Sequence, residues 1–436
     1  MLSEKPPATP FRPSAMVLLI LAALVLLAYL PTLTQSLIED DYPNIALAQV
    51  YGSPSGWHAM LGNPVFRLRA TTWLLMYSVH RLFGMHAAAF YGATILLQVL
   101  NTWLVYSLGA WRTVGASLAT WAAGFFAVHE GHQEAIMWLS GSTEPLLLLF
   151  GLISFIAWVL FLEKRRLLWY SVSILSLMGA LLSKESAVVL FPLLILPLIV
   201  DRRPWRDALF LIPHAVMSGL AVLSIVQSRT SSFRFTDGSF SLLAPFWLTW
   251  PNSFARLFWF WGLLSLIAIL VWRPSHYRRI LFIAFTWIGL SLAPYSFLTY
   301  MTRIPSRQTH LASVGLALVV GLALSTLCAQ YWSTRRTVVT VVCAAILVHN
   351  VGYLWTKKRA QFLTRAEPTD QLIALARRTS GPIHIQCFPR AALIAEAAVQ
   401  LMTTHDTGDL VWSSAEARRR GNVTTFCYSD QRSASQ

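Results

Sequence analysis

Long apolar segments dominate this sequence and restrict the folds that it can adopt. Ala15 to Leu30, Pro145 to Leu162 and Leu311 to Trp332 approach or exceed the ~18 apolar residues that are typical of a membrane span. Of the 436 residues, 56% are hydrophobic and 12% are charged, whereas a soluble domain carries about 25% charged residues. Because lipid offers no partners to backbone polar groups, such segments must cross as helices. The sequence therefore predicts an all-α polytopic membrane protein.

The net charge of +15 is explained by membrane topology. Most basic residues lie in short segments between apolar runs, which is the distribution that keeps loops in the cytoplasm, so we expect no nucleic-acid partner. Placing these segments inside gives about eleven spans, with the N-terminus in the cytoplasm and the C-terminus outside. The basic segments are Trp111–Thr113, Glu163–Arg166, Asp201–Asp207, Arg273–Arg279 and Ser333–Arg336.

The composition changes near the C-terminal end. Two predicted strands, Pro382–Phe388 and Asn422–Tyr428, alternate with segments of helical spacing, which indicates a small α/β cap. Cys387 and Cys427 each lie in one of these strands, and a disulfide and a pair of free thiols are both open. The predicted regions are a cytoplasmic tail (1–14), a membrane domain (15–356) and an extracytoplasmic cap (357–436).

An acidic cluster, Glu39, Asp40 and Asp41, directly follows the first apolar segment. Three adjacent carboxylates at a membrane surface are costly unless they are solvated, paired or used in chemistry. Acidic residues at outer helix ends are also ordinary in membrane proteins, so a topological role stays open. The long amphipathic first outer loop favours a function, with Trp57, Phe66 and Trp73 expected along the membrane interface.

Four arginines are predicted on the outer side, against the trend of the other basic residues. They are Arg67, Arg69, Arg303 and Arg307. Bidentate binding of a phosphate is a good reason for an arginine there. Lipid headgroups and the acidic cluster itself are alternative partners.

A second outward loop holds further candidates. His129, His132 and Glu134 could ligate a divalent metal, hydrogen-bond an acceptor or orient Asp40, and their spacing matches no zinc signature. Lys184 and Glu185 lie at another outer helix end. As adjacent residues of opposite charge, they are expected to neutralise each other.

These features fit a reaction on a lipid-linked substrate. Arginines would hold the phosphate of a donor whose chain lies between helices, and an aspartate would accept the proton of an acceptor hydroxyl. The sequence has no Gly-rich nucleotide loop, which argues against a soluble nucleotide sugar. A transporter or flippase of a lipid-linked saccharide is the alternative, although it would place ionisable residues near the bilayer midplane. A scaffold without activity also stays open.

The motifs resemble those of the C-type integral-membrane glycosyltransferases, in particular the protein O-mannosyltransferase-like and related bacterial multi-span enzymes. Any one motif is weak, but five occur in the same order over the region from roughly Pro31 to Gly315. They are IEDDYPNI, FRLRATTW, HEGHQEAIMWLSGSTE, LLSKESAVVLFPLL and SRQTHLASVGLAL.

The resemblance implies roles for individual residues. Asp40 takes the place of the catalytic base, and Asp41 beside it is the second catalytic candidate, which would share or exchange that role. Arg67 takes the place of the first-loop arginine, although Leu68 stands where the family usually has proline. Arg307 takes the place of the late arginine.

The resemblance also implies the reaction class. It is an inverting-type transfer of a hexose, such as mannose, from a polyprenyl-phosphate donor at the extracytoplasmic face of a bacterial inner or plasma membrane. The acceptor is a protein, lipid or glycan. Ser142 stands where the family often has arginine, and Gln308 and His310 stand where it has aromatic residues. These departures leave the sugar and the acceptor open.

Overall fold

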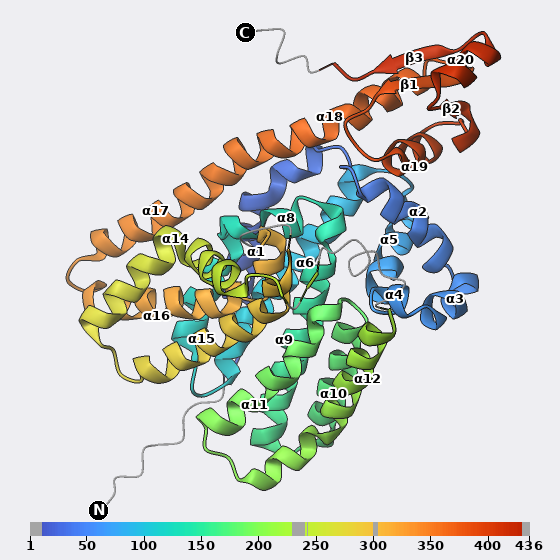
Figure 1. Ribbon diagram of the computed structural model, residues 1–436. Coiled ribbons are helices and arrows are strands. Elements are labelled where there is room, and N and C mark those ends of the chain that lie inside the picture. The colour runs from blue at the N-terminus through green and yellow to red at the C-terminus, as the bar shows by residue number, and fades with distance from the viewer. Residues whose placement is uncertain (1–10, 229–239, 242, 300–303, 430–436) are drawn as a thin grey trace, which may run out of the picture.

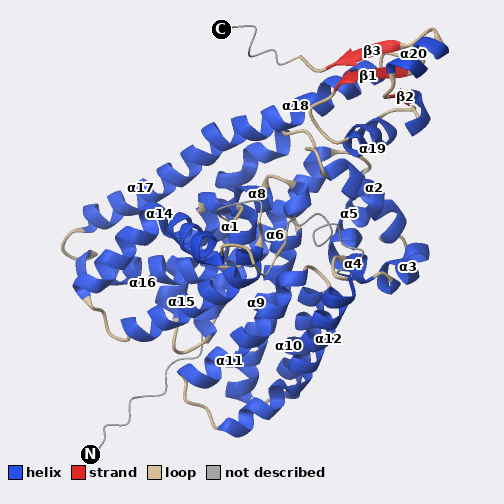
Figure 2. Ribbon diagram, in the orientation of Figure 1, coloured by secondary structure: helices blue, strands red, loops and turns tan. Residues whose placement is uncertain are grey.

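The computed structural model describes residues 11–228, 240–241, 243–299 and 304–429. A helical body carries a small sheet at its C-terminal end (Figures 1 and 2). Eight helical segments of the described chain are long and apolar enough to cross a membrane. Three shorter apolar segments also lie in the body, Ala116–Val128, Leu167–Leu181 and Glu185–Val200. The all-α polytopic fold with a small cap is thus confirmed.

Two helices packed at close range form the centre of the body, α7 (Ala116–Val128) and α16 (Ser313–Tyr331). A Cβ atom at Gly321 of α16 would lie 2.7 Å from the backbone nitrogen of Ala122 and 2.8 Å from its Cβ atom. A small residue is needed where two helix backbones approach so closely. The other helices of the body are α1 (Ala15–Tyr29), α6 (Ala87–Ser107), α9 (Thr143–Lys164), α10 (Leu167–Leu181), α11 (Leu190–Val200), α12 (Ile212–Ser228), α14 (Phe246–Trp272) and α15 (Tyr277–Leu292).

The first loop folds into short helices instead of an extended segment. Trp57 is 46% exposed, as expected for a residue at an interface, but Trp73 is 3% exposed and packs edge-on against Phe66. The interfacial position predicted for Trp73 is therefore wrong, because this loop has an apolar core of its own. The loop helices are α2 (Asp41–Tyr51), α3 (Trp57–Gly62), α4 (Pro64–Arg67) and α5 (Ala70–Phe83), and the second loop holds α8 (Gln133–Ile136).

One continuous helical path joins the body to the cap (Figure 1). It runs from α17 (Arg336–Tyr353) through a π-helical turn (Leu354–Lys358) into α18 (Arg359–Ala376). The predicted boundary at residue 357 lies inside this turn, and the division into regions stays a prediction.

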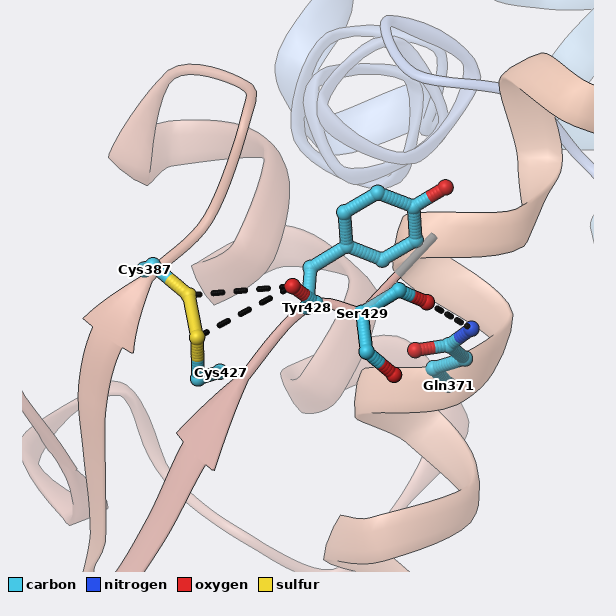
Figure 3. The surroundings of a disulfide bond; sticks show 5 residues. All are labelled: Gln371, Cys387, Cys427, Tyr428 and Ser429. Carbon is cyan, nitrogen blue, oxygen red and sulfur yellow. Dashed lines mark hydrogen bonds between the residues drawn. A yellow bond between two sulfur atoms is a disulfide. The ribbon is translucent and has the colours of Figure 1, made fainter. Parts of the chain in front are cut away.

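The cap contains a three-stranded parallel sheet with the order β2-β1-β3. The strands β1 (Ile383–Cys387) and β3 (Thr424–Cys427) match the two predicted ones, whereas the two-residue β2 (Leu410–Val411) is too short to be recognised from its sequence. A disulfide joins Cys387 to Cys427, which resolves the open alternative (Figure 3). Beyond it, Gln371 of α18 donates a hydrogen bond to the carbonyl of Ser429. The cap helices are α19 (Ala392–Met402) and α20 (Ser414–Arg420).

Candidate functional site

The acidic cluster lies where the chain turns from α1 into α2. A 3₁₀ turn (Leu30–Thr34) ends the first span, Glu39 adopts a left-handed backbone with φ of 46°, and Asp41 begins α2. A carboxylate in the first turn of a helix is favoured by the helix dipole. The three carboxylates of the cluster nevertheless have three different environments.

Asp41 is completely buried and fully hydrogen-bonded. Its Oδ2 accepts from the backbone amide of Ile38 (2.9 Å), and its Oδ1 accepts from the amide (2.8 Å) and hydroxyl (2.6 Å) of Ser140. Burial raises the pKa of Asp41 to about 7, and these hydrogen bonds oppose the shift. Asp41 thus joins the first loop to the second and has no free oxygen for chemistry.

Asp40 is exposed, and its carboxylate makes no hydrogen bond or ion pair with any residue that the structure describes, although its backbone carbonyl accepts from the amide of Asn44 (3.1 Å). Desolvation and the neighbouring Glu39 raise the pKa of Asp40, and Arg307, Arg365 and Arg390 lower it in part. A carboxylate that is accessible, unpaired and more basic than usual has the properties of a proton acceptor.

Glu39 is the paired member of the cluster. Its carboxylate contacts Arg365 of α18 (2.7 Å) and Arg390, which lies between β1 and α19 (2.8 Å). Neither arginine lies in one of the sequence motifs described above. No local pattern relates Glu39 to Arg365, because 326 residues separate them.

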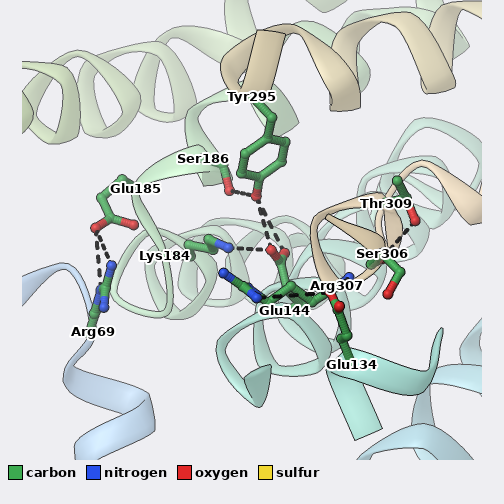
Figure 4. A network of polar contacts seen from close by, with 10 residues as sticks. All are labelled: Arg69, Glu134, Glu144, Lys184, Glu185, Ser186, Tyr295, Ser306, Arg307 and Thr309. Atoms are coloured by element: carbon green, nitrogen blue, oxygen red, sulfur yellow. Dashed lines mark hydrogen bonds and ion pairs between the residues drawn. The ribbon is translucent and has the colours of Figure 1, made fainter. Parts of the chain in front are cut away.

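Arg307 lies beside the second loop. Its backbone amide donates to Glu134 Oε2 (3.2 Å), and its guanidinium group lies 3.9 Å from the same oxygen (Figure 4). The Arg307 guanidinium also lies 4.7 Å from the ring centre of Trp138. The guanidinium of Arg365 lies 4.4 Å from the same ring centre. Arg307 and Arg365 therefore share one aromatic ring.

The other candidate arginines have separate positions. Arg67 ends α4, and its half-buried guanidinium has no partner among the described residues, with Nε buried. Arg69 forms an ion pair with Glu185 (3.0 Å), while Arg303 lies outside the described residues. No contact within the described chain joins Arg67 to Asp40.

The histidines of the second and late motifs form a buried cluster in which neighbouring rings meet edge to face. The His132 ring lies 5.0 Å from that of His129 and 4.6 Å from that of His310. His132 Nδ1 contacts Gln98 Nε2 (3.0 Å) and its Nε2 contacts Ser313 Oγ (2.7 Å), while His310 Nε2 contacts Gln98 Oε1 (3.1 Å). Burial lowers the pKa of all three histidines.

These contacts do not fit the metal interpretation. Both ring nitrogens of His132 are engaged, and Glu134 is held by Arg307. The described residues contain no group of three or more His, Cys, Asp or Glu side chains that could hold a metal ion. The histidine cluster instead fixes the second loop and the late motif to α6 through Gln98.

Lys184 and Glu185 do not pair with each other, so that expectation is wrong. Lys184 forms a buried ion pair with Glu144, and Glu185 pairs with Arg69 (Figure 4). The Tyr295 hydroxyl lies 3.3 Å and 3.4 Å from the two oxygens of Glu144. The two neighbours diverge because Lys184 has an extended backbone where the following 3₁₀ turn begins.

A cavity of about 800 Å³ adjoins the second loop and the late motif. Its walls include three cationic side chains, Arg256, Lys357 and Lys358, and one carboxylate, Glu130. A space of this size accommodates a ligand headgroup. The remaining lining residues are His129, Gly131, Gln133, Asn252, Ala255, Leu257, Trp259, Ser306, Thr309, His349 and Tyr353.

No family model and no curated protein sequence matches the chain. Solved structures do match. ArnT from Cupriavidus metallidurans bound to undecaprenyl phosphate has a TM-score of 0.57 at 13% identity, over 95% of this chain and 90% of that one. The oligosaccharyltransferase AglB from Archaeoglobus fulgidus, in complex with an inhibitory peptide and a dolichol-phosphate, has a TM-score of 0.56 at 12% identity, over 90% of this chain and 64% of that one. The chain therefore has the fold of the C-type membrane glycosyltransferases ArnT and AglB.

Proposed function

We propose that the chain is a membrane glycosyltransferase that moves a sugar from a polyprenyl-phosphate donor to an acceptor hydroxyl, with Asp40 as the base. The observation that carries this proposal is the difference within the acidic cluster. Asp40 alone is exposed and without a partner among the described residues, and the charge of Arg307 acts on it. The fold adds support, because the two similar structures hold undecaprenyl phosphate and a dolichol-phosphate.

In the proposed reaction the acceptor oxygen attacks the anomeric carbon of the sugar with inversion. Asp40 takes the hydroxyl proton as the new glycosidic bond forms. The bond from the anomeric carbon to the phosphate oxygen breaks, and polyprenyl phosphate leaves. Arg307 stabilises the charge on the leaving group, and Arg67 has a free guanidinium to assist.

The other predicted site residues have supporting roles, because they hold the loops around the site in place. His129, His132, His310 and Glu134 set the shape of the second loop and the late motif. Lys184 and Glu185 anchor the segment between α10 and α11 through their separate partners. The proposed setting is the extracytoplasmic face of a bacterial inner or plasma membrane.

A comparison of cell products tests this proposal. Glycans and glycolipids of cells without the gene are analysed by mass spectrometry after complementation with the wild type, Asp40→Asn or Arg378→Gln. Arg378 is an exposed residue after α18 and serves as the control. Loss of one sugar addition with Asp40→Asn alone is expected, and full product with Asp40→Asn would reject the base.

A second measurement separates the enzyme from a flippase. Purified protein is incubated in detergent with undecaprenyl phosphate that carries radiolabelled mannose, glucose or galactose, together with membrane extract from the gene-deleted cells. A glycosyltransferase releases undecaprenyl phosphate, whereas a flippase leaves the donor intact.

A further inference from the structure

The cap contributes directly to the acidic cluster. Glu39 forms ion pairs with two arginines from different elements, Arg365 from α18 and Arg390 from the cap. Arg365 uses both Nε (3.3 Å) and Nη2 (2.7 Å), so it meets the carboxylate as a fork with fixed geometry. We call Glu39, Arg365 and Arg390 the Glu39 ion-pair cluster.

The backbone of Glu39 explains why such a cluster is needed. Its φ of 46° lies in the left-handed region, which a residue with a Cβ atom adopts at a cost. Strained conformations persist when the surrounding structure holds them. Since Asp40 is the next residue, the conformation of Glu39 sets the direction of the Asp40 side chain.

Arg365 also reaches the other half of the site. Its guanidinium lies 4.4 Å from the ring centre of Trp138, and the same ring carries Arg307 at 4.7 Å. Trp138 is buried, so it keeps a defined position between the loops. One side chain therefore contacts both the neighbour of Asp40 and the ring beside Arg307.

Apolar packing keeps the cap in place around these charges. Helix α19 packs on α2 (Figure 1), and Ile373 and Ala398 belong to the same buried cluster as Tyr42 and Ile45 of α2. The arginines thus come from a docked domain and not from a loose tail.

We infer that the C-terminal helix and cap complete the active centre, with Arg365 as a positioning residue that aligns Asp40 with Arg307 through Glu39 and Trp138, and Arg390 as its second support. This inference rests on the proposed function. It assigns a role in the reaction to a region that carries none of the motifs.

The pH dependence of turnover distinguishes positioning from folding. The charged groups that act on Asp40 are Glu39 from its own loop, Arg307 from the late motif, Arg365 from α18 and Arg390 from the cap. As a base, Asp40 must be ionised, so activity falls below its pKa. Removal of a positive charge raises that pKa, and removal of Glu39 lowers it.

The variants Arg365→Gln and Glu39→Gln are compared with the control Arg378→Gln. Both site variants break the same ion pair, but we expect the acidic limb of the rate profile to move by about one pH unit in opposite directions, upward for Arg365→Gln and downward for Glu39→Gln. Arg365→Lys keeps the charge and should leave the limb near its wild-type position while turnover falls. The probe is release of undecaprenyl phosphate from the radiolabelled donors described above.

Hydrogen exchange of the full-length protein in detergent provides a second test, which does not depend on enzyme turnover. Faster exchange in residues 36–44 and 136–142 is expected for Arg365→Gln, with no change for Arg378→Gln. If the wild type cleaves no donor, the proposed function fails while this second test still probes the contacts. The inference would be overturned if the acidic limb of the rate profile did not move in either Gln variant. It would also be overturned if hydrogen exchange in Arg365→Gln equalled that of the wild type.

Discussion

Asp41 Oδ1 accepts hydrogen bonds from both the backbone amide and the hydroxyl group of Ser140. This pair joins two loops that lie 99 residues apart in the sequence. It makes Asp41 a structural residue, while the adjacent Asp40 has no partner in the described chain. Two neighbouring carboxylates of one motif should therefore respond to mutation in different ways.

Replacing Asp41 by asparagine should destabilise the protein. An amide has one acceptor oxygen, so its NH₂ group would face either the amide of Ile38 or the donors of Ser140. A buried donor left without a partner costs about 1–3 kcal/mol. Thermal unfolding in detergent should show this loss for Asp41→Asn, a loss of about 1 kcal/mol for Ser140→Ala, and none for Asp40→Asn. Equal destabilisation by Asp40→Asn would contradict the assignment.

Arg307→Lys should weaken the binding of polyprenyl phosphate although the charge is kept. Lysine cannot form the planar fork of a guanidinium or stack in the same way on Trp138. We expect a roughly tenfold loss of affinity, which corresponds to about 1.4 kcal/mol, and a larger loss for Arg307→Ala. Binding of radiolabelled undecaprenyl phosphate to the purified protein measures this effect, with Arg378→Ala as the control. Unchanged affinity in both Arg307 variants would exclude the phosphate role.

The buried pair of Glu144 and Lys184 should be sensitive to the loss of one partner. Lys184→Met leaves an uncompensated carboxylate in the body, and removal of one partner of a buried ion pair costs about 3–5 kcal/mol. The double variant Lys184→Met with Glu144→Leu removes both charges and should recover much of the stability. Lys164→Met at the exposed end of α9 is the matched control in the same unfolding assay. A double variant no more stable than Lys184→Met would refute the pairing.

Loss of the disulfide should loosen the cap and spare the body. The bond between Cys387 and Cys427 closes a separation of 40 residues, and the chain entropy of such a loop corresponds to about 4 kcal/mol. Limited proteolysis of Cys387→Ser should cut between residues 380 and 428 faster than in the wild type. Cys343→Ser, at a free cysteine of α17, serves as the control. A cap that stays resistant in Cys387→Ser would show that packing alone holds it.

The helices of the body and the strands β1 and β3 could be predicted because both depend on local patterns. A long apolar run has few alternatives in lipid, and a short alternating segment has a period of two. The different roles of Asp40 and Asp41 could not be predicted from the sequence, because two identical neighbours are distinguished by the tertiary contacts of Asp41, above all those with the distant Ser140. Arg365 was missed for a related reason, since nothing near it in the sequence resembles a site. The pairing of Lys184 with Glu185 failed because adjacency in sequence does not imply contact when the backbone changes conformation between two residues.

The Glu39 ion-pair cluster can form only late in the synthesis of the protein. Glu39 leaves the ribosome 326 residues before Arg365, and Arg390 follows after that. If Arg365 and Arg390 act as inferred above, Asp40 lacks the support that aligns it with Arg307 until this late segment has been synthesised and has docked on the body. On the proposed function, the chain would then become active only late in its biogenesis, and a product truncated before the cap would insert into the membrane without transferring sugar.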